Sequence, residues 1–306
     1  MPVVEELGID LGTVNVLVYV RGRGIVLQEP SVVAQELETG EVVAVGEEAR
    51  SMMGRAPETI IVRRPLRAGV IADYRVTQQM LFHFMSSAIG KTRLLKPRVC
   101  VTVPFGATQV ERRAVQEAAL EAGASRAYRI PEPIAGAIGA GLPIHTPGGH
   151  MVVDLGGGAS QAAVLSVYGV VASSAIRNGG VSMDDAIAGY VRRKYNLMLG
   201  QPTAEEAKIR IGAAMALDEP LRMEVQGRDQ VTGLPRSVEI NSDDIVEALE
   251  EPISLIINMV KSVLERTPPE LASDIIDRGM TMIGGGALLR NLDQLLTQET
   301  GVPVYV

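Results

Sequence analysis

Two short stretches of this sequence combine an aspartate with a glycine turn: Asp10-Leu11-Gly12-Thr13 and Asp154-Leu155-Gly156-Gly157-Gly158. Glycine lets backbone amides approach a ligand closely because it has no Cβ, and successive amides in a turn form an anion-binding concavity. An aspartate beside that concavity can hold hydrated Mg²⁺ through its oxygens. One copy could equally be an ordinary glycine-rich hairpin. Two matched copies favour a site for a nucleoside triphosphate and its metal.

Apolar runs stand on both sides of each turn and must position it. Val16-Leu17-Val18-Tyr19-Val20 follows the first turn, and Ala162-Ala163-Val164-Leu165 follows the second. Each stretch therefore predicts a strand, a tight turn and a returning strand. The chain of 306 residues is longer than one hydrophobic core usually supports. We expect two related domains, each with one such hairpin.

Two further features could contribute to a ligand site. Met280-Thr281-Met282-Ile283 predicts a strand that runs into Gly284-Gly285-Gly286, and a helix is expected from Ala287. A helix N-terminus after a glycine turn can bind a polar or anionic ligand. Glu132 lies between two prolines, which stiffen the backbone around it. Its carboxylate either faces solvent at a helix N-terminus or positions water at a phosphate site.

The composition narrows the class of protein. Hydrophobic residues make up 46% of the chain but aromatic residues only 3%, so the cores should be aliphatic. The net charge of −7, with no run of Lys or Arg, argues against nucleic-acid binding. Cys100 is the single cysteine and lies in an apolar strand, which indicates a buried residue in a reducing cytoplasm. No segment has transmembrane length or the pattern of a signal peptide, so any membrane contact should be peripheral.

One loop is basic and apolar at once. Leu94 and Leu95 are flanked by four cationic side chains in Lys91-Thr92-Arg93-Leu94-Leu95-Lys96-Pro97-Arg98. On general grounds the better interpretation is a connector whose leucines pack under a neighbouring helix. The alternative is a loop that inserts into an anionic membrane.

Several segments together resemble the bacterial actins of the MreB/Mbl family, within the superfamily of actin, heat-shock chaperone and sugar-kinase ATPases. The resemblance covers essentially the whole chain. The matching segments include Gly8-Ile9-Asp10-Leu11-Gly12-Thr13, Glu29-Pro30-Ser31-Val32-Val33-Ala34, Gly69-Val70-Ile71-Ala72-Asp73, Glu132-Pro133-Ile134-Ala135 and Gly284-Gly285-Gly286-Ala287-Leu288-Leu289. The runs that begin at Glu29 and Gly69 point to the MreB branch of the superfamily.

The resemblance implies an α/β, actin-like, two-lobed ATPase fold of duplicated RNase H-like domains. The implied lobes are 1–147 and 148–306, each with two subdomains. In the first lobe these are IA, about 1–31 and 66–147, and IB, about 32–65. In the second they are IIA, about 148–180 and 242–306, and IIB, about 181–241. The closing helix that follows in the family is expected to be absent here.

The resemblance also implies a site for ATP and Mg²⁺. Asp10 and Asp154 would hold the metal, with Glu132 and Asp154 catalytic. The residues that would bind the nucleotide are Gly12, Thr13, Asn15, Gly156, Gly157, Gly158, Glu205, Lys208, Gly284, Gly285 and Gly286. The family hydrolyses ATP slowly and forms antiparallel double protofilaments on the inner face of the cytoplasmic membrane, where they organise cell-wall synthesis. By that resemblance Leu94 and Leu95 become a membrane-insertion loop, and proteins of the elongation and cell-wall machinery become expected partners.

The sequence departs from the family pattern at three places. Ala159-Ser160-Gln161 replaces Thr-Thr-Glu, whose first threonine helps to orient the attacking water. Val16 replaces a threonine and Val181 an aspartate near the nucleotide. Loss of a hydrogen bond made only in the transition state should slow hydrolysis more than binding. The alternative function is therefore a polymerising scaffold with little or no hydrolysis. A small-molecule kinase on the same fold is disfavoured, because the sequence gives no indication of a second substrate pocket.

Overall fold

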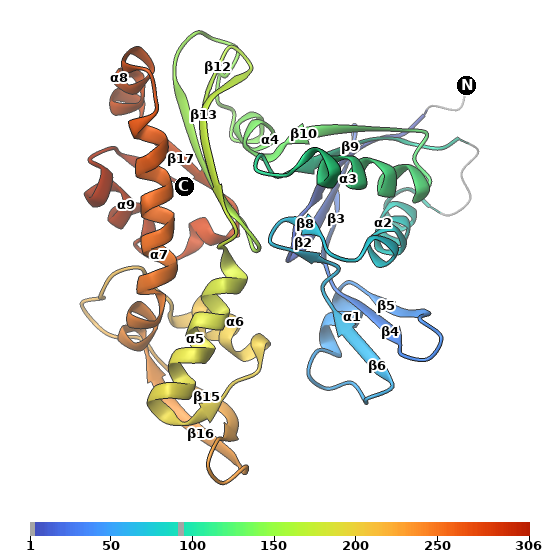
Figure 1. The fold of residues 1–306 in the computed structure, drawn as a ribbon, viewed down its shortest axis with the longest axis vertical. Helices are drawn as coiled ribbons and strands as arrows, with labels where there is room; N and C mark the ends of the chain where they lie inside the picture. The colour runs from blue at the N-terminus through green and yellow to red at the C-terminus, as the bar shows by residue number, and fades with distance from the viewer. Residues whose placement is uncertain (1–3, 91–94) are drawn as a thin grey trace. The chain divides into compact units, whose positions relative to one another are not determined.

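A computed structural model describes residues 4–90 and 95–306. The chain forms two compact units, Met1–Ala135 and Gly136–Val306, and each is described by itself (Figure 1). Helix α4 (Glu132–Gly139) carries the chain from the first unit into the second. The subdomain limits expected from the resemblance stay predictions.

A mixed five-stranded sheet forms the centre of the first unit, in the order β10-β9-β1-β2-β3. Three consecutive strands form an antiparallel meander, while β9 and β10 run parallel to β1. The period of two is clear in β2, where Val16, Val18 and Val20 are buried and the residues between them are not. The bounds are β1 (Glu6–Leu11), β2 (Asn15–Val20), β3 (Gly24–Pro30), β9 (Arg98–Val103) and β10 (Arg126–Pro131).

Two helices pack on this sheet through an apolar face. α2 (Tyr74–Ile89) contributes Met80 and Phe84 to the core, and α3 (Gln109–Glu121) contributes Val115. Asp73 caps α2, and Thr108 forms a capping box with Glu111 at the start of α3, as the spacing predicts.

A smaller sheet in the order β5-β4-β6 completes the first unit, with a short helix and a two-stranded ribbon. Its core is formed by small aliphatic residues such as Val32, Ala44 and Ala49. The bounds are β4 (Val33–Glu36), β5 (Val42–Val45), α1 (Glu47–Ser51), β6 (Ile60–Arg63), β7 (Leu66–Arg67) and β8 (Val70–Ile71).

The central sheet of the second unit has the same plan as the first, in the order β13-β12-β11-β17-β18. A three-stranded antiparallel meander is again joined on one side by two parallel strands. The internal repeat predicted from the hairpins therefore extends to the whole sheet. The bounds are β11 (His150–Leu155), β12 (Ser160–Ser166), β13 (Gly169–Ile176), β17 (Met280–Ile283) and β18 (Val304–Tyr305).

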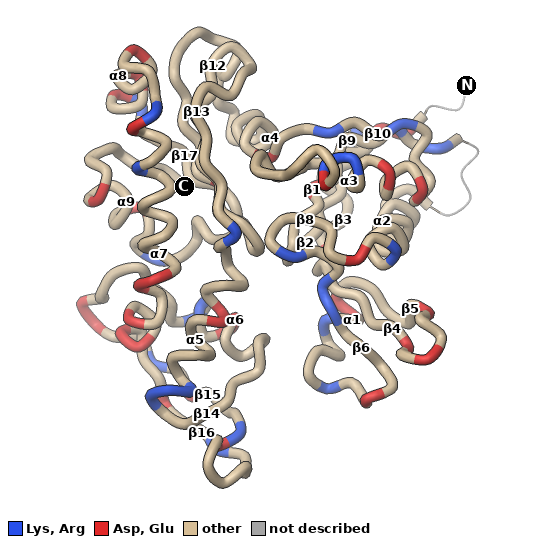
Figure 2. Tube along the Cα trace, viewed as in Figure 1, with Lys and Arg blue, Asp and Glu red and all other residues tan. Residues whose placement is uncertain are grey.

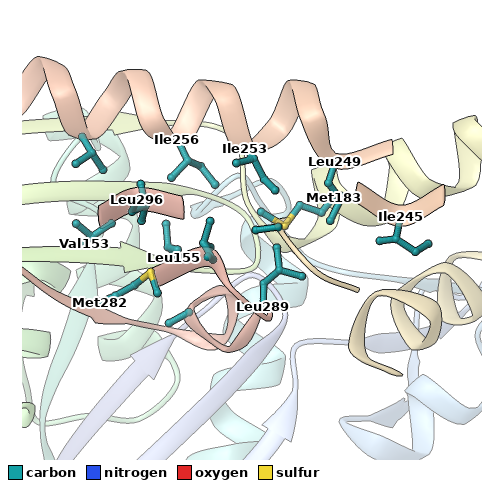
Figure 3. Close-up of a cluster of buried hydrophobic side chains, with 14 of the residues drawn as sticks. Val153, Leu155, Met183, Ile245, Leu249, Ile253, Ile256, Met282, Leu289 and Leu296 are labelled. Carbon is teal, nitrogen blue, oxygen red and sulfur yellow. The ribbon is translucent and has the colours of Figure 1, made fainter. Parts of the chain in front are cut away.

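An aliphatic core packs between this sheet and the long helix α7. Figure 3 shows Ile253 and Ile256 of α7 pointing toward Val153 and Leu155 of β11, with Met282 and Leu296 beside them. The buried residues described for this cluster are aliphatic or methionine apart from Tyr190, which agrees with the low aromatic content of the sequence. The helices are α5 (Gly180–Tyr195), α6 (Gln201–Ile211), α7 (Ser242–Glu265), α8 (Pro269–Arg278) and α9 (Leu292–Thr300), and the peripheral sheet holds β14 (Leu197–Met198), β15 (Arg222–Asp229) and β16 (Pro235–Asn241).

The prediction of a helix that begins at Ala287 is wrong. Residues Gly285–Leu288 form a single 3₁₀ turn, and a regular helix begins only at Leu292. Glycine has a low helix propensity. Asn291, with a left-handed backbone (φ 61°), separates the 3₁₀ turn from the helix that follows. In the described part of the chain, no helix combines the length and apolarity needed to cross a bilayer. Basic and acidic residues are interspersed along the elements of both units (Figure 2).

Candidate functional site

The first hairpin holds its aspartate at the end of a strand. Asp10 pairs with Leu17 and Leu11 with Val16, so residues 12–15 form a four-residue connection that includes the exposed Asn15. Thr102, on the parallel strand β9, bridges two groups of β1. Its hydroxyl donates to Asp10 Oδ1 (2.8 Å) and accepts from the Leu11 amide (3.1 Å). This bridge fixes Oδ1 of the carboxylate.

Electrostatics at Asp10 favours the neutral acid more than usual. Its side chain reaches solvent, yet the protein atoms crowded around the carboxyl raise the pKa of Asp10 by desolvation, and the Thr102 hydrogen bond partly opposes this shift. A bound cation would restore the charged form, because an adjacent positive charge favours a carboxylate. The site is therefore suited to a metal ion.

Other side chains hold the first turn from behind. Ser31 is fully buried, and its hydroxyl donates to the Gly12 carbonyl (2.5 Å) while its amide donates to the Val14 carbonyl (2.8 Å). The hydroxyl of the buried Thr13 accepts from the Gly69 amide (2.9 Å). A Cβ on Gly12 would lie 2.6 Å from the Asn15 carbonyl oxygen, so the turn has no room for any other residue. These contacts use two carbonyls and one hydroxyl of the turn, and its amides are not needed for them.

Glu132 lies at the same sheet edge as Asp10. The carboxyl ends of the parallel strands β1, β9 and β10 meet there, and these ends carry Asp10, Thr102 and then Glu132, the first residue of α4. Ligands of α/β sheets bind outside the carboxyl ends of parallel strands. The structure thus brings together all the candidates of the first unit: Asp10, Gly12, Thr13, Asn15 and Glu132.

The second hairpin has the same register as the first. Asp154 pairs with Gln161 and Leu155 with Ser160, again leaving a four-residue connection, 156–159. The Gln161 amide lies 3.4 Å from Asp154 Oδ2, so a side chain of the antiparallel neighbour orients this carboxylate. Ser160 is fully buried and donates to the Asn178 carbonyl (2.6 Å). Its hydroxyl is therefore committed to the core.

The second turn rests on the N-terminus of α5. The amide of Gly180 donates to the Gly156 carbonyl (3.0 Å), and the amide of Val181 donates to the Gly157 carbonyl (2.8 Å). A Cβ on Gly179 would lie 2.6 Å from the Gly156 carbonyl oxygen. The close contact of two backbones explains the glycine at position 179, whereas a Cβ on Gly180 would lie 3.6 Å from the nearest backbone atom, Gly157 Cα.

The third glycine turn lies directly against the second aspartate. Gly284 has a left-handed backbone (φ +83°), and a Cβ there would lie 2.8 Å from Asp154 Oδ1 and 2.6 Å from the Leu155 carbonyl oxygen. A Cβ on Gly286 would lie 2.9 Å from the Leu155 carbonyl oxygen, while no described atom lies within 4 Å of a Cβ on Gly285. The second unit thus repeats the arrangement of the first, with site residues at the carboxyl ends of the parallel strands β11 and β17.

The expected nucleoside residues Glu205 and Lys208 lie on α6, both partly buried. The ammonium of Lys208 binds the Gly180 carbonyl (2.8 Å) and Asp184 Oδ1 (2.6 Å). Lys208 is thereby linked to the helix turn that supports residues 156–159. Its role as a direct nucleotide ligand stays a prediction.

Three residues that hold the site in place were not predicted from the sequence: Ser31, Thr102 and Asp184. Only weak signals pointed to them, such as a hydroxyl directly after Pro30 and another just before the end of an apolar strand. Cys100 is only partly buried, although the apolar strand around it predicts a buried residue, and burial raises the pKa of its thiol.

No group of three or more His, Cys, Asp or Glu side chains among the described residues could hold a metal by itself. Mg²⁺ is commonly bound through one or two carboxylates together with water and phosphate oxygens, and single aspartates beside phosphate-binding turns fit that mode. Of the two residues expected at the membrane, Leu94 lies outside the described residues, and Leu95 is 39% exposed.

Comparison with known proteins gives the same family throughout. The family model described as MreB/Mbl protein matches residues 4–306. The cell shape-determining protein MreB of Escherichia coli (strain K12) is 52% identical over 307 residues, covering 99% of this chain and 88% of that protein. The corresponding protein Mbl of Bacillus subtilis (strain 168) is 49% identical over 302 residues, covering 99% and 91%.

A solved structure shows the same fold. MreB 5 of Spiroplasma citri bound to AMPPNP superposes with a TM-score of 0.94 at 38% identity, covering 100% of this chain and 92% of that one. The actin-like fold expected from the sequence is therefore confirmed. The chain belongs to the MreB/Mbl family of bacterial actins.

Proposed function

We propose that this chain is an ATP-binding bacterial actin that polymerises and takes part in determining cell shape. The observation that carries the proposal is the pair of equivalent hairpins, each with an aspartate at a strand end and a turn in which a Cβ on the first glycine would crowd a backbone carbonyl oxygen. Support comes from relatives named for cell shape and from the solved relative that binds the nucleotide analogue AMPPNP.

The residues of each unit fit parts of Mg²⁺–ATP. Gly12, Thr13 and Asn15 in one unit, and Gly156, Gly157 and Gly158 in the other, would bind phosphates through backbone amides. Asp10 and Asp154 would bind the hydrated metal, which neutralises phosphate charge when bound. Glu205 and the turn Gly284–Gly286 would contact the nucleoside.

Polymerisation is the most informative test. We expect Mg²⁺–ATP to give filaments that pellet in an ultracentrifuge and appear in negative stain as paired, antiparallel protofilaments. Asp10→Asn should raise the critical concentration, because the metal loses a ligand. The absence of filaments under every nucleotide and lipid condition would contradict the proposal.

The rate of hydrolysis depends on the second turn. We propose slow hydrolysis, with Glu132 positioning water and Asp154 holding the metal. Ala159 has no hydroxyl to orient the water, and the hydroxyl of Ser160 is buried and bound to Asn178. This arrangement favours, as the second candidate, a nucleotide-binding scaffold with little or no hydrolysis.

Phosphate release separates these two candidates. Ala159→Thr should raise the hydrolysis rate by roughly tenfold, the equivalent of about 1.4 kcal/mol in the transition state, with little change in ATP affinity. Ala159→Val is the matched control, because it has the shape of threonine without the hydroxyl. Equal rates for the two variants would show that the missing hydroxyl is not the limiting feature, and a wild-type rate at background would leave only the scaffold.

We further propose that the filaments lie on the inner face of the cytoplasmic membrane and organise cell-wall synthesis with proteins of the elongation machinery. Leu95 is exposed and is followed by the exposed cations Lys96 and Arg98. Leu94→Ser/Leu95→Ser should strongly reduce pelleting of filaments with anionic liposomes. The wild-type protein itself should pellet well only above the critical concentration, because two leucines insert weakly and rely on the avidity of the filament. Unchanged pelleting would exclude this loop.

A further inference from the structure

Lys208 holds the support of the second phosphate turn. Its ammonium lies 2.6 Å from Asp184 Oδ1 and 2.8 Å from the carbonyl oxygen of Gly180. The Asp184 side chain is only 4% exposed and that of Lys208 only 16%. Breaking a buried ion pair is costly because the remaining charge is left in a poorly solvated place. The pair is therefore a fixed part of the fold.

Gly180 connects this ion pair to the 156–159 turn. The residue whose carbonyl binds Lys208, Gly180, donates its own amide to the Gly156 carbonyl (3.0 Å), and the next amide, of Val181, binds the Gly157 carbonyl (2.8 Å). Gly180 also sits so close to the ammonium that a Cβ there would lie 3.2 Å from Lys208 Nζ. Lys208 is thus connected to residues 156–159 through two backbone hydrogen bonds at the start of α5.

Helix α6, which bears Lys208, packs firmly enough to hold the ammonium at the start of α5. Ala204 and Ala207 are fully buried on its inner side, and α6 packs directly against α5. The helix that bears the expected nucleoside residue Glu205 thereby also fixes the first turn of α5.

We propose that Lys208 is a positioning residue, which shapes the 156–159 turn for phosphate through Gly180 and Asp184. The inference rests on the proposed ATP-binding function and adds a division of labour to it. In this division Lys208 affects the affinity for the phosphates more than the affinity for the nucleoside.

Binding of ATP and of adenosine separates this role from a direct contact with the nucleoside. We expect Lys208→Met and Asp184→Asn each to weaken ATP binding by roughly tenfold, and the double variant to be no weaker than the worse single one, since coupled residues are not additive. Adenosine affinity, measured by saturation-transfer NMR, should change less than about twofold. Lys208→Arg, which keeps the charge, should recover part of the ATP affinity.

Lys261→Met is the matched control, because it breaks an exposed ion pair with Glu299 (2.6 Å) on α7 and α9 and should leave both affinities unchanged. Thermal unfolding would verify that each variant is folded, and Asp184→Asn tests the proposal even if Lys208→Met does not fold. If Asp184→Asn leaves ATP affinity unchanged, or if Lys208→Met weakens adenosine as much as ATP, the positioning role is wrong. Failure of the wild-type protein to bind ATP would instead remove the proposed function, and this inference with it.

Discussion

The two hairpins have the same backbone plan but are supported in different ways. In both, an aspartate stands at the end of the central strand, and four residues connect paired positions, Leu11 to Val16 and Leu155 to Ser160. The carbonyl of Gly12 is bound by the side chain of Ser31, whereas that of Gly156 is bound by the backbone amide of Gly180. A strand end therefore supports the first turn, and a helix N-terminus supports the second.

The aspartates are oriented from opposite sides. Asp10 is bound by Thr102 of the parallel neighbour β9. At the corresponding place in the second sheet, Ile283 stands in register with Asp154 and has no polar group, and Gln161 of the antiparallel neighbour approaches the carboxylate instead. The strand order preserves the position of a functional side chain, while the surrounding residues can change how it is held.

The largest expected effect tests the equivalence of the turns. In Gly12→Ala the new Cβ would lie 2.6 Å from the Asn15 carbonyl oxygen, and in Gly156→Ala it would lie 3.0 Å from that of Ala159. Gly12→Ala should destabilise the fold by about 1–3 kcal/mol and weaken ATP binding by roughly tenfold or more. Gly156→Ala should do distinctly less. Thermal unfolding and ATP titration measure both, and equal damage would show that the two turns are equally tight.

An intermediate effect is expected from the hydroxyl that orients Asp10. Thr102→Val removes a donor to the carboxylate and leaves the Leu11 amide without this acceptor, which should cost about 1–2 kcal/mol. Thr102→Ser keeps the hydroxyl and serves as the control.

The same variant has a defined pH dependence. Burial raises the pKa of Asp10 and Thr102 lowers it, so Thr102→Val should raise the pKa further. The carboxylate would then be protonated at a higher pH, and Mg²⁺–ATP affinity should begin to fall at a higher pH during acidification. For stability the sign is opposite. A carboxyl with a raised pKa contributes stability below its unfolded pKa and loses it as the pH rises through its folded pKa. Without ligand, the stability difference between wild type and Thr102→Val should therefore be smallest at acid pH. If ATP affinity of the variant falls at the same pH as that of the wild type during acidification, the role of Thr102 is wrong.

The smallest effect concerns the anchor of the first turn. Ser31→Ala removes the hydrogen bond to the Gly12 carbonyl and should cost about 1 kcal/mol, with a few-fold loss of ATP affinity. Ser51→Ala, which removes an exposed hydroxyl contact to the Glu48 carbonyl on α1, is the control and should change neither quantity. A thermal midpoint for Ser31→Ala equal to that of the control would show that the amide of Ser31 holds the turn alone.

Much of the fold could be predicted from local patterns. The apolar runs around Asp10 and Asp154 predicted both hairpins, and the spacing of Thr108 and Glu111 predicted the start of α3. The helix predicted from Ala287 failed, because a glycine-rich start and a left-handed Asn291 favour a 3₁₀ turn. Local rules succeed where neighbouring residues decide the conformation and fail where glycine leaves several open.

The sequence by itself determined where the two aspartates and the three glycine turns would lie, because strands, turns and caps depend on residues close along the chain. Only the tertiary structure decided what holds them. Thr102 reaches Asp10 across 92 positions, Ser31 reaches the Gly12 carbonyl across 19, and Lys208 reaches Gly180 across 28. Such contacts follow from strand register and helix packing, and no periodicity in the sequence encodes them.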